Sequence, residues 1–156
     1  MNNQIYIFYL RFLYFGYVCF CFIFRPKVRG AYVLVTFDEK ILIIKNSYKS
    51  GWTFPCGMID RGETEIAGAK RELYEETGIS CNESDLVFLK MFLSTNGFKK
   101  DHQFFYLLRL DSLPKVELDM REVIDHQWVS VDDLYQRQTP EGVRSIVGEF
   151  KDFIFN

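Results

Sequence analysis

Apolar and polar residues follow one another along this chain in blocks that predict separate strands. Two apolar stretches, residues 30–37 and 41–45, flank the polar tripeptide 38–40. This pattern predicts a hairpin of two buried strands. A polar loop over residues 46–51 follows, and residues 52–55 then predict a short strand that leads into the most acidic part of the chain.

The second half of the chain predicts three more strands and a closing helix. Residues 86–94 and 103–110 predict two strands joined by a turn at residues 96–97, which are Asn-Gly. Residues 123–129 predict a further strand. Apolar residues then recur at helical spacing over residues 141–154. Strands, a helix, more strands and a second helix together predict an α+β fold.

The central helix is predicted within residues 57–79. Thr64 and Glu65 mark its start, good helix formers run through Glu76, and Gly78 marks its end. One face of this helix is suited to packing on a sheet. That face carries Ile66, Ala69, Leu73 and Thr77.

Three carboxylates crowd another side of the same helix. Glu72, Glu75 and Glu76 are three and four residues apart, so they can share that side. Like charges at this spacing destabilise a helix by roughly a few tenths of a kcal/mol per pair. A divalent cation would remove the repulsion, and oxygen ligands suit Mg²⁺ or Mn²⁺. The pattern therefore predicts a metal site.

Residues 57–79 resemble the signature of the Nudix hydrolases, G-x5-E-x7-R-E-U-x-E-E-x-G-U, where U is a bulky aliphatic residue. All nine fixed positions are filled, by Gly57, Glu63, Arg71, Glu72, Leu73, Glu75, Glu76, Gly78 and Ile79. A solvated acidic helix would explain the acids but not the two positions upstream. The approach W-x-F-P-x-G also resembles this family, which often has glycine where Cys56 stands.

The resemblance implies an α/β/α sandwich around a mixed β-sheet, over roughly residues 28–153. We divide the chain into an apolar N-terminal segment, residues 1–25, and a Nudix hydrolase domain, residues 26–156. The implied activity is a divalent-metal-dependent pyrophosphohydrolase. Its substrate class is a nucleoside diphosphate linked to another group, and its cofactor is Mg²⁺ or Mn²⁺.

The resemblance also implies roles for individual residues. The metal ligands would be Glu72, Glu75 and Glu76, with the carbonyl of Gly57 nearby. Arg71 would pair with Glu63 or with a helix glutamate and hold the loop against the helix. Gly57, Glu63 and Gly78 are therefore predicted to be structural, and Arg71 to support catalysis.

The general base is left open by the sequence. Glu75 or Glu76 can serve through a metal-bound water, and Glu122 is the best candidate from a later loop. Phosphates can be met by Lys45 or Arg61, and Trp52 can stack on a base. None of these residues selects one substrate. A non-catalytic nucleotide-binding module and a diphosphate-ester isomerase are the alternatives to hydrolysis.

Composition narrows the choice of partners. The formal net charge is -2, so no overall positive field attracts nucleic acid, and only an RNA 5′ end stays open as a nucleic-acid substrate. A homodimer also stays open. The four cysteines include no C-x-x-C pair, and with two histidines they do not favour a zinc site. Reduced thiols predict a cytoplasmic location.

The N-terminal stretch of residues 5–24 is apolar or aromatic except for Arg11. It just reaches the length of a transmembrane helix. It is also compatible with a helix on a membrane surface, or with one packed on the domain or a partner chain. Basic residues within 25–29 follow it and would mark the cytoplasmic side. We therefore hypothesise tethering to the inner face of a membrane through residues 5–24.

Overall fold

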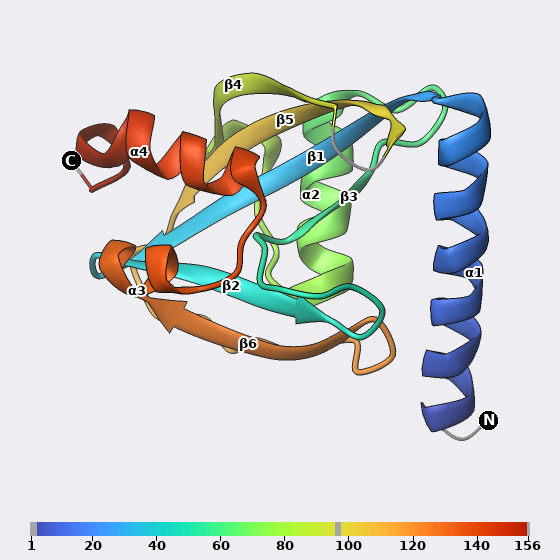
Figure 1. Ribbon diagram of the computed structural model, residues 1–156. Coiled ribbons are helices and arrows are strands. Elements are labelled where there is room, and N and C mark those ends of the chain that lie inside the picture. The colour runs from blue at the N-terminus through green and yellow to red at the C-terminus, as the bar shows by residue number, and fades with distance from the viewer. Residues whose placement is uncertain (1–2, 96–97, 156) are drawn as a thin grey trace.

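The computed structural model describes residues 3–95 and 98–155. The predicted turn at residues 96–97 lies outside the described residues. Helices and strands are interspersed along the chain (Figure 1). The helices are α1 (Asn3–Phe24), α2 (Glu65–Thr77), the short 3-10 helix η1 (Glu83–Asp85), α3 (Val131–Gln136) and α4 (Glu141–Phe155). The strands are β1 (Lys27–Phe37), β2 (Lys40–Asn46), β3 (Cys56–Met58), β4 (Leu86–Ser94), β5 (Lys100–Arg109) and β6 (Val123–Val129).

A six-stranded mixed sheet forms the centre of the molecule, in the order β4-β5-β1-β2-β6, with β3 paired to β1. The central pair, β1 and β5, is parallel, and its register matches Lys27 with Lys100 and Thr36 with Arg109. The neighbouring pairs are antiparallel. Because β1 also pairs with β3, the sheet places the start of the acidic stretch directly beside its central strand.

The predicted strands are present, except that one is displaced along the chain. The hairpin of β1 and β2 turns at Asp38 and Glu39, both with positive φ. The short strand predicted over residues 52–55 is wrong, because that segment makes only one isolated bridge, from Thr53 to Ile44. The strand forms three residues later, as β3, where the backbone of Cys56–Met58 reaches β1.

Helix α2 begins and ends where its sequence predicts. The Thr64 hydroxyl accepts a hydrogen bond from the Ala67 N–H at 3.2 Å. Gly78 closes the helix with φ of 71°, a left-handed conformation that glycine adopts without strain, and its N–H donates to the Tyr74 carbonyl at 2.8 Å. The helix is therefore fixed at both ends.

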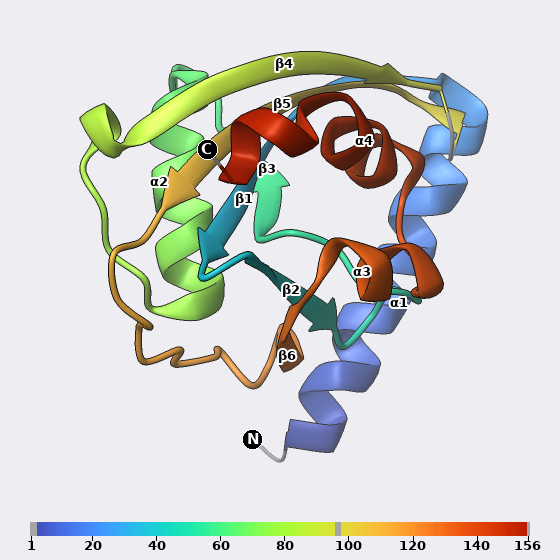
Figure 2. The same ribbon diagram turned by 90° about the vertical axis from the view of Figure 1, so that its left-hand side faces the viewer.

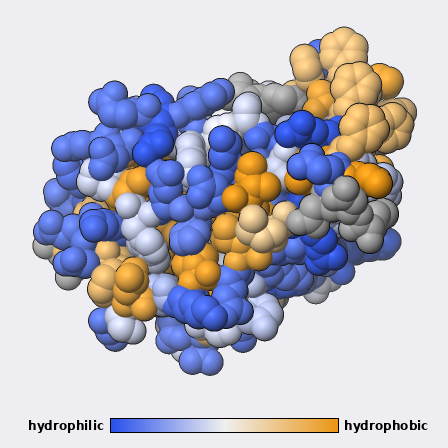
Figure 3. All heavy atoms as spheres, turned by 90° about the horizontal axis from the view of Figure 1, so that it is seen from below, coloured by the Kyte–Doolittle hydropathy of each residue, from blue (hydrophilic) through white to orange (hydrophobic). Residues whose placement is uncertain are grey.

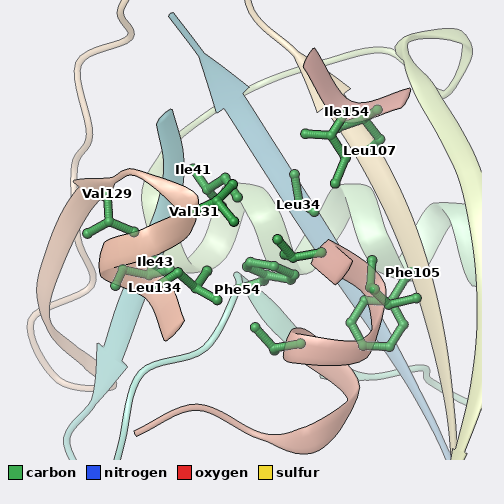
Figure 4. Close-up of a cluster of buried hydrophobic side chains, with 13 residues drawn as sticks. Leu34, Ile41, Ile43, Phe54, Phe105, Leu107, Val129, Val131, Leu134 and Ile154 are labelled. Atoms are coloured by element: carbon green, nitrogen blue, oxygen red, sulfur yellow. The ribbon is translucent and has the colours of Figure 1, made fainter. Parts of the chain in front are cut away.

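Two apolar cores, one on each face of the sheet, make the three-layer sandwich. On one face, α3 and α4 cover a cluster that includes Leu34, Ile43, Phe54 and Phe105 (Figure 4). On the other face, α2 covers a cluster of Ala31, Val33, Val35, Leu42, Ala69, Leu73, Ile79, Leu86, Tyr106 and Leu108. The α+β prediction and the implied α/β/α sandwich are confirmed.

Helix α1 stands at one edge of this sandwich and runs along it (Figures 1 and 2). Most of its side chains are exposed, including Phe8, Phe12 and Phe15. Figure 3 shows hydrophobic atoms gathered at the right-hand edge of the molecule, on the side where Figure 1 places α1. One span, Gln4–Phe24, is long and apolar enough to cross a membrane by length and composition alone, a criterion that signal sequences also meet.

Candidate functional site

Arg71 links the loop before α2 to the acidic face of the helix. Its guanidinium donates to both carboxylate oxygens of Glu63, at 3.0 and 2.9 Å, and to the Met58 carbonyl at 2.9 Å. The same group donates to Glu72 at 2.7 Å and to Glu75 at 3.1 Å. The pairing of Arg71 with Glu63 that the resemblance implies is therefore present.

Glu63 is also held by the backbone of its own loop. The Asp60 N–H donates to its carboxylate at 3.0 Å. The Arg71 hydrogen bonds, and then this backbone bond, lower the pKa of Glu63. Glu63 is thus a charged link that orders the segment between β3 and α2.

The carboxylate of Glu72 lies against the backbone of Gly57. A Cβ added at Gly57 would come within 2.0 Å of the Glu72 carboxyl carbon. Any larger residue at position 57 would have to displace the end of the Glu72 side chain, so glycine keeps this carboxylate in place. Burial raises the pKa of Glu72, although Arg71 opposes the shift. Gly57 therefore lets the Glu72 carboxylate lie directly against the β3 backbone.

Glu76 is the most buried acid of the helix, with 4% of its surface exposed. Its carboxylate accepts hydrogen bonds from the Cys56 N–H at 2.7 Å and from the Asn46 amide at 3.2 Å. Burial raises the pKa of Glu76 to about 8, and the charge of Glu72 adds to the shift. The surrounding protein leaves the negative charge at this position incompletely compensated.

Glu72, Glu76 and Glu122 line one cavity of about 410 Å³. Glu122 comes from the loop before β6 and is half-buried. Burial raises the pKa of Glu122, and the charges of Asp119 and Glu75 raise it further. Glu72, Glu76 and Glu122 thus supply carboxylate oxygens, the ligand type that a hard divalent cation prefers, to one cavity.

The three predicted metal ligands do not lie in the same environment. Glu75 is exposed and is held by Arg71, whereas Glu72 and Glu76 line the cavity. Within residues 3–95 and 98–155, no group of three or more His, Cys, Asp or Glu side chains is close enough to hold a metal ion in this arrangement. Because Arg71 draws Glu72 and Glu75 toward itself, the assignment of all three as ligands stays a prediction.

The predicted substrate-binding residues lie outside this cavity. Lys45 and Arg137 both approach the Trp52 ring, with the Lys45 Nζ 5.9 Å from its centroid. Trp52 packs against the core on the α3 and α4 side of the sheet. Arg61 is exposed on the loop before α2. None of these three lines the cavity with Glu76, so their roles in binding remain predictions.

Other residues of the cavity had no sequence signal that marked them together. Tyr14, Tyr17, Val18 and Cys21 reach it from α1. Lys49, Lys99 and Asp101 reach it from the loops and from β5. They lie far apart in the chain, and the parallel pairing of β1 with β5 brings Asp101 opposite Val28. Spacing within one segment cannot reveal such a set.

Comparison with known proteins decides the family. A family model described as the NUDIX domain matches residues 26–149, which is most of the chain. The chain belongs to the Nudix family. The matched region contains the whole acidic signature and all six strands, and it begins just after α1.

Curated relatives and solved structures agree with this assignment. The mRNA decapping complex subunit 2 of Schizosaccharomyces pombe is 29% identical over 133 residues, which cover 78% of this chain and only 17% of that relative. Phosphatase NudJ of Escherichia coli is 26% identical over 115 residues, 72% of this chain and 74% of the relative.

The fold of the Nudix chain matches those of solved structures. An Ap4A hydrolase of C. elegans has a TM-score of 0.70 at 23% identity, covering 81% of this chain and 97% of that one. A bifunctional NMN adenylyltransferase/ADP ribose pyrophosphatase of Francisella tularensis, complexed with AMP and a Mn ion, has a TM-score of 0.74 at 20% identity. It covers 89% of this chain and 47% of that one.

Proposed function

We propose that this chain hydrolyses the phosphoanhydride bond of a nucleoside diphosphate linked to another group, in a reaction that requires Mg²⁺ or Mn²⁺. The observation that carries the proposal is the complete signature, folded so that Glu72 and Glu76 line one cavity with Glu122. The proposal is also supported by the names of similar proteins. NudJ is named a phosphatase, and the structural neighbour from Francisella tularensis is named an ADP ribose pyrophosphatase, complexed with AMP and a Mn ion.

Glu72, Glu75 and Glu76 would hold the ion, together with the carbonyl of Gly57. Their fit to a cation is supported by geometry: Glu72 and Glu76 line the same cavity, and the buried Glu76 carboxylate accepts hydrogen bonds from two neutral donors, the Cys56 N–H and the Asn46 amide. When bound, the ion offsets the negative charge of the diphosphate and makes water a better nucleophile.

The side chains of the protein supply the remaining steps. Arg71 fixes the position of Glu72 by a 2.7 Å hydrogen bond and anchors the loop that carries Gly57 through the Met58 carbonyl. Glu122 accepts the proton of the attacking water. Burial raises the pKa of Glu122, which makes it a stronger base than a solvated glutamate.

Release of a nucleoside monophosphate or another cleavage product from a panel of nucleotides, followed by chromatography with Mg²⁺ or with EDTA, tests the proposal. The panel holds dNTPs, nucleotide sugars, dinucleoside polyphosphates, ADP-ribose and capped RNA. We expect release from at least one compound with Mg²⁺ and none with EDTA. Glu76→Gln should lower kcat by about a hundredfold or more, whereas Glu149→Gln, in an exposed pair with Lys90, should not.

Other outcomes identify the alternatives. Hydrolysis that survives both Glu75→Gln and Glu76→Gln would contradict the role of the acidic helix. Binding without release would indicate a non-catalytic module, and a rearranged product would indicate an isomerase. Capped RNA is the second candidate substrate, because the relative from Schizosaccharomyces pombe is named as a decapping subunit. Release of a capped nucleotide, measured by chromatography, would favour it.

We also propose that the outward face of α1 rests on a membrane that contains anionic lipid, with the domain on the cytoplasmic side. Phe8, Phe12 and Phe15 are exposed on that face, and the exposed basic residues Arg25 and Lys27 follow the helix. Apolar side chains beside cations are complementary to such a surface.

Fractionation of the full-length protein tests this placement. We expect it to sediment with vesicles containing phosphatidylglycerol and to require detergent for release. Replacing Phe8 and Phe15 together by serine should release it. Full recovery in the soluble fraction without detergent would contradict membrane binding, and twice the monomer mass by light scattering would indicate a homodimer through α1 instead.

A further inference from the structure

The inner face of α1 forms a wall of the cavity that holds Glu76. Tyr14, Tyr17 and Val18 line that cavity together with Glu72 and Glu76. The match to the Nudix domain begins at residue 26, so this wall lies outside the family domain. Any contact that this α1 wall makes with a ligand is therefore a property of this chain and does not follow from the signature.

Specific contacts hold α1 in this position along its length. The Arg11 Nε donates to the Ser47 carbonyl at 3.2 Å. Near the other end, the Phe22 ring meets Phe98 edge to face, with centroids 5.0 Å apart. Cys21 is buried between α1 and the domain, with 1% of its surface exposed. The wall is thus packed on the domain at both ends.

Tyrosines and phenylalanines occupy opposite sides of the central turns of α1. Phe8, Phe12 and Phe15 are exposed, at 73%, 67% and 67%. Tyr14 and Tyr17, one helical turn apart, instead turn toward the cavity. The inward side therefore carries aromatic rings that also have a polar group, which suits a ligand with both a flat ring and hydrogen-bonding atoms.

Cations accompany both inward tyrosines. The Lys49 ammonium lies 5.9 Å from the Tyr14 ring centroid and 5.2 Å from that of Tyr48. The Tyr14 and Tyr48 centroids are 5.5 Å apart. The Lys99 ammonium lies 5.7 Å from the Tyr17 ring and pairs with the buried Asp101 carboxylate at 2.9 Å, which leaves Lys49 as the better partner for a phosphate. Aromatic rings with ammonium groups beside them match the two halves of a nucleotide, the base and the phosphates.

The hydroxyl of Tyr17 supplies an independent observation. It is buried beside Cys21 and has no hydrogen-bond partner of ordinary geometry among the described residues. A buried hydroxyl without a partner is costly, and it is a favourable place for a ligand atom to bind. Tyr17 lines the same cavity as Glu72 and Glu76.

We infer that α1 completes the substrate site. Tyr14 and Tyr17 bind the nucleoside part of a nucleotide, and Lys49 contacts its phosphates, so that the diphosphate lies toward Glu76. This inference rests on the proposed function for the reaction, but it concerns binding. Helix α1 is accordingly a determinant of specificity, and a change in its inner face alters which nucleotide is accepted.

Binding of two probes to the full-length protein in EDTA, measured by calorimetry, tests the inference. ADP carries a nucleoside and a diphosphate, whereas inorganic pyrophosphate carries only the phosphates. We expect Tyr14→Ala to raise the Kd for ADP about tenfold and to leave the Kd for pyrophosphate within about twofold. Tyr17→Phe, which removes only the hydroxyl, should weaken ADP in the same direction. Phe15→Ala, on the outer side of the same helix, should change neither.

The outcomes separate this inference from the proposed function. An unchanged Kd for ADP in both tyrosine variants, an equal loss for both probes, or no binding of ADP to the wild-type protein would overturn the inference. If ADP binds as expected but no compound in the panel is hydrolysed, the proposed function fails alone. If a substrate is found, Tyr14→Ala should raise its KM about tenfold with kcat nearly unchanged. Circular dichroism of each variant checks that α1 is intact.

Discussion

Glu76 is a buried acid whose ionisation is linked to the stability of the metal-free protein. In the folded protein the pKa of Glu76 is raised to about 8, so its carboxyl group stays protonated up to about that pH. In the unfolded chain the ordinary pKa of 4.5 applies. Between these values the folded state binds more protons, so stability falls as the pH rises. We expect the free energy of unfolding in EDTA to drop by a few kcal/mol from pH 5 to pH 8, an amount set by the difference between the folded and unfolded pKa values of Glu76.

Glu76→Gln provides the control for this prediction. A neutral amide still accepts the hydrogen bond from the Cys56 N–H, which the carboxylate now accepts at 2.7 Å. The variant should therefore lose most of the pH dependence in urea unfolding curves. A wild-type protein with a flat profile between pH 5 and pH 8 would show that the carboxylate ionises at its ordinary pKa in the folded state.

Cys56 is predicted to be unreactive despite its place in the cavity. Burial, together with the charge of Glu76, raises the pKa of Cys56 to about 12, so that almost none of it is thiolate at neutral pH. We expect iodoacetamide at pH 7.5 to modify the exposed Cys19 well before Cys56, as followed by mass spectrometry of peptides. Equal rates at the two cysteines would contradict this.

At the scale of elements, the contact between β3 and α2 is the one on which the site depends. Gly57→Ala would place a Cβ about where the Glu72 carboxylate lies, 2.0 Å from its carboxyl carbon. The end of the Glu72 side chain can move, so the fold should survive. We expect kcat to fall about a hundredfold because a group of the site is displaced, with the melting temperature nearly unchanged.

A second glycine serves as the control for Gly57→Ala. Gly16 lies on α1, and a Cβ there meets nothing within 4 Å. Gly16→Ala should therefore leave kcat as it is, and it should raise the melting temperature slightly, because alanine favours a helix interior over glycine. Full activity of Gly57→Ala would show that the position of Glu72 against the β3 backbone is not needed for the reaction.

The elements themselves could largely be predicted from the sequence, because their signals are local. The Thr64 cap and the Gly78 stop fixed the ends of α2 correctly. The short strand was placed wrongly over residues 52–55, since its position depends on where β1 offers partners and not on its own composition. The pairing of Arg71 with Glu63 was implied by the family signature. The separation of the exposed Glu75 from Glu72 and Glu76, which line the cavity, depends instead on how α2 packs against β1 and β3.

At the scale of the whole molecule, we expect the core between the sheet and α4 to contribute to stability and not to substrate specificity. Ile146 is fully buried in that core, on the face opposite α2. Ile146→Ala should destabilise the protein by about 2–5 kcal/mol, because it loses burial and leaves a cavity. Thermal and urea unfolding should show this, while KM stays the same below the unfolding transition.

An exposed residue provides the control for Ile146→Ala. Leu113 keeps 60% of its surface in solvent, so Leu113→Ala should change stability by about 0.5 kcal/mol or less. If the two variants were equally stable, the packing of α4 on the sheet would contribute little. A change in KM for Ile146→Ala would link the two faces of the sheet.

The position of α1 is the feature that could least be derived from the sequence. Its composition allowed a spanning helix, a surface helix or a packed helix. Which side chains turn inward depends on partners such as Ser47 and Phe98, which are distant in the chain. For this reason, the sequence of residues 1–25 alone could not predict the aromatic wall of the cavity.

The parallel pairing of β1 with β5 has a consequence for how the molecule is made. Residue 27 pairs with residue 100 and residue 36 with residue 109, so the central strand lacks this neighbour until most of the chain has left the ribosome. Long-range pairing of this kind slows folding, because a large loop must close first. During that interval the aromatic α1 and the apolar β1 are both available to chaperones, which makes the first third of the nascent chain the segment most in need of protection from aggregation.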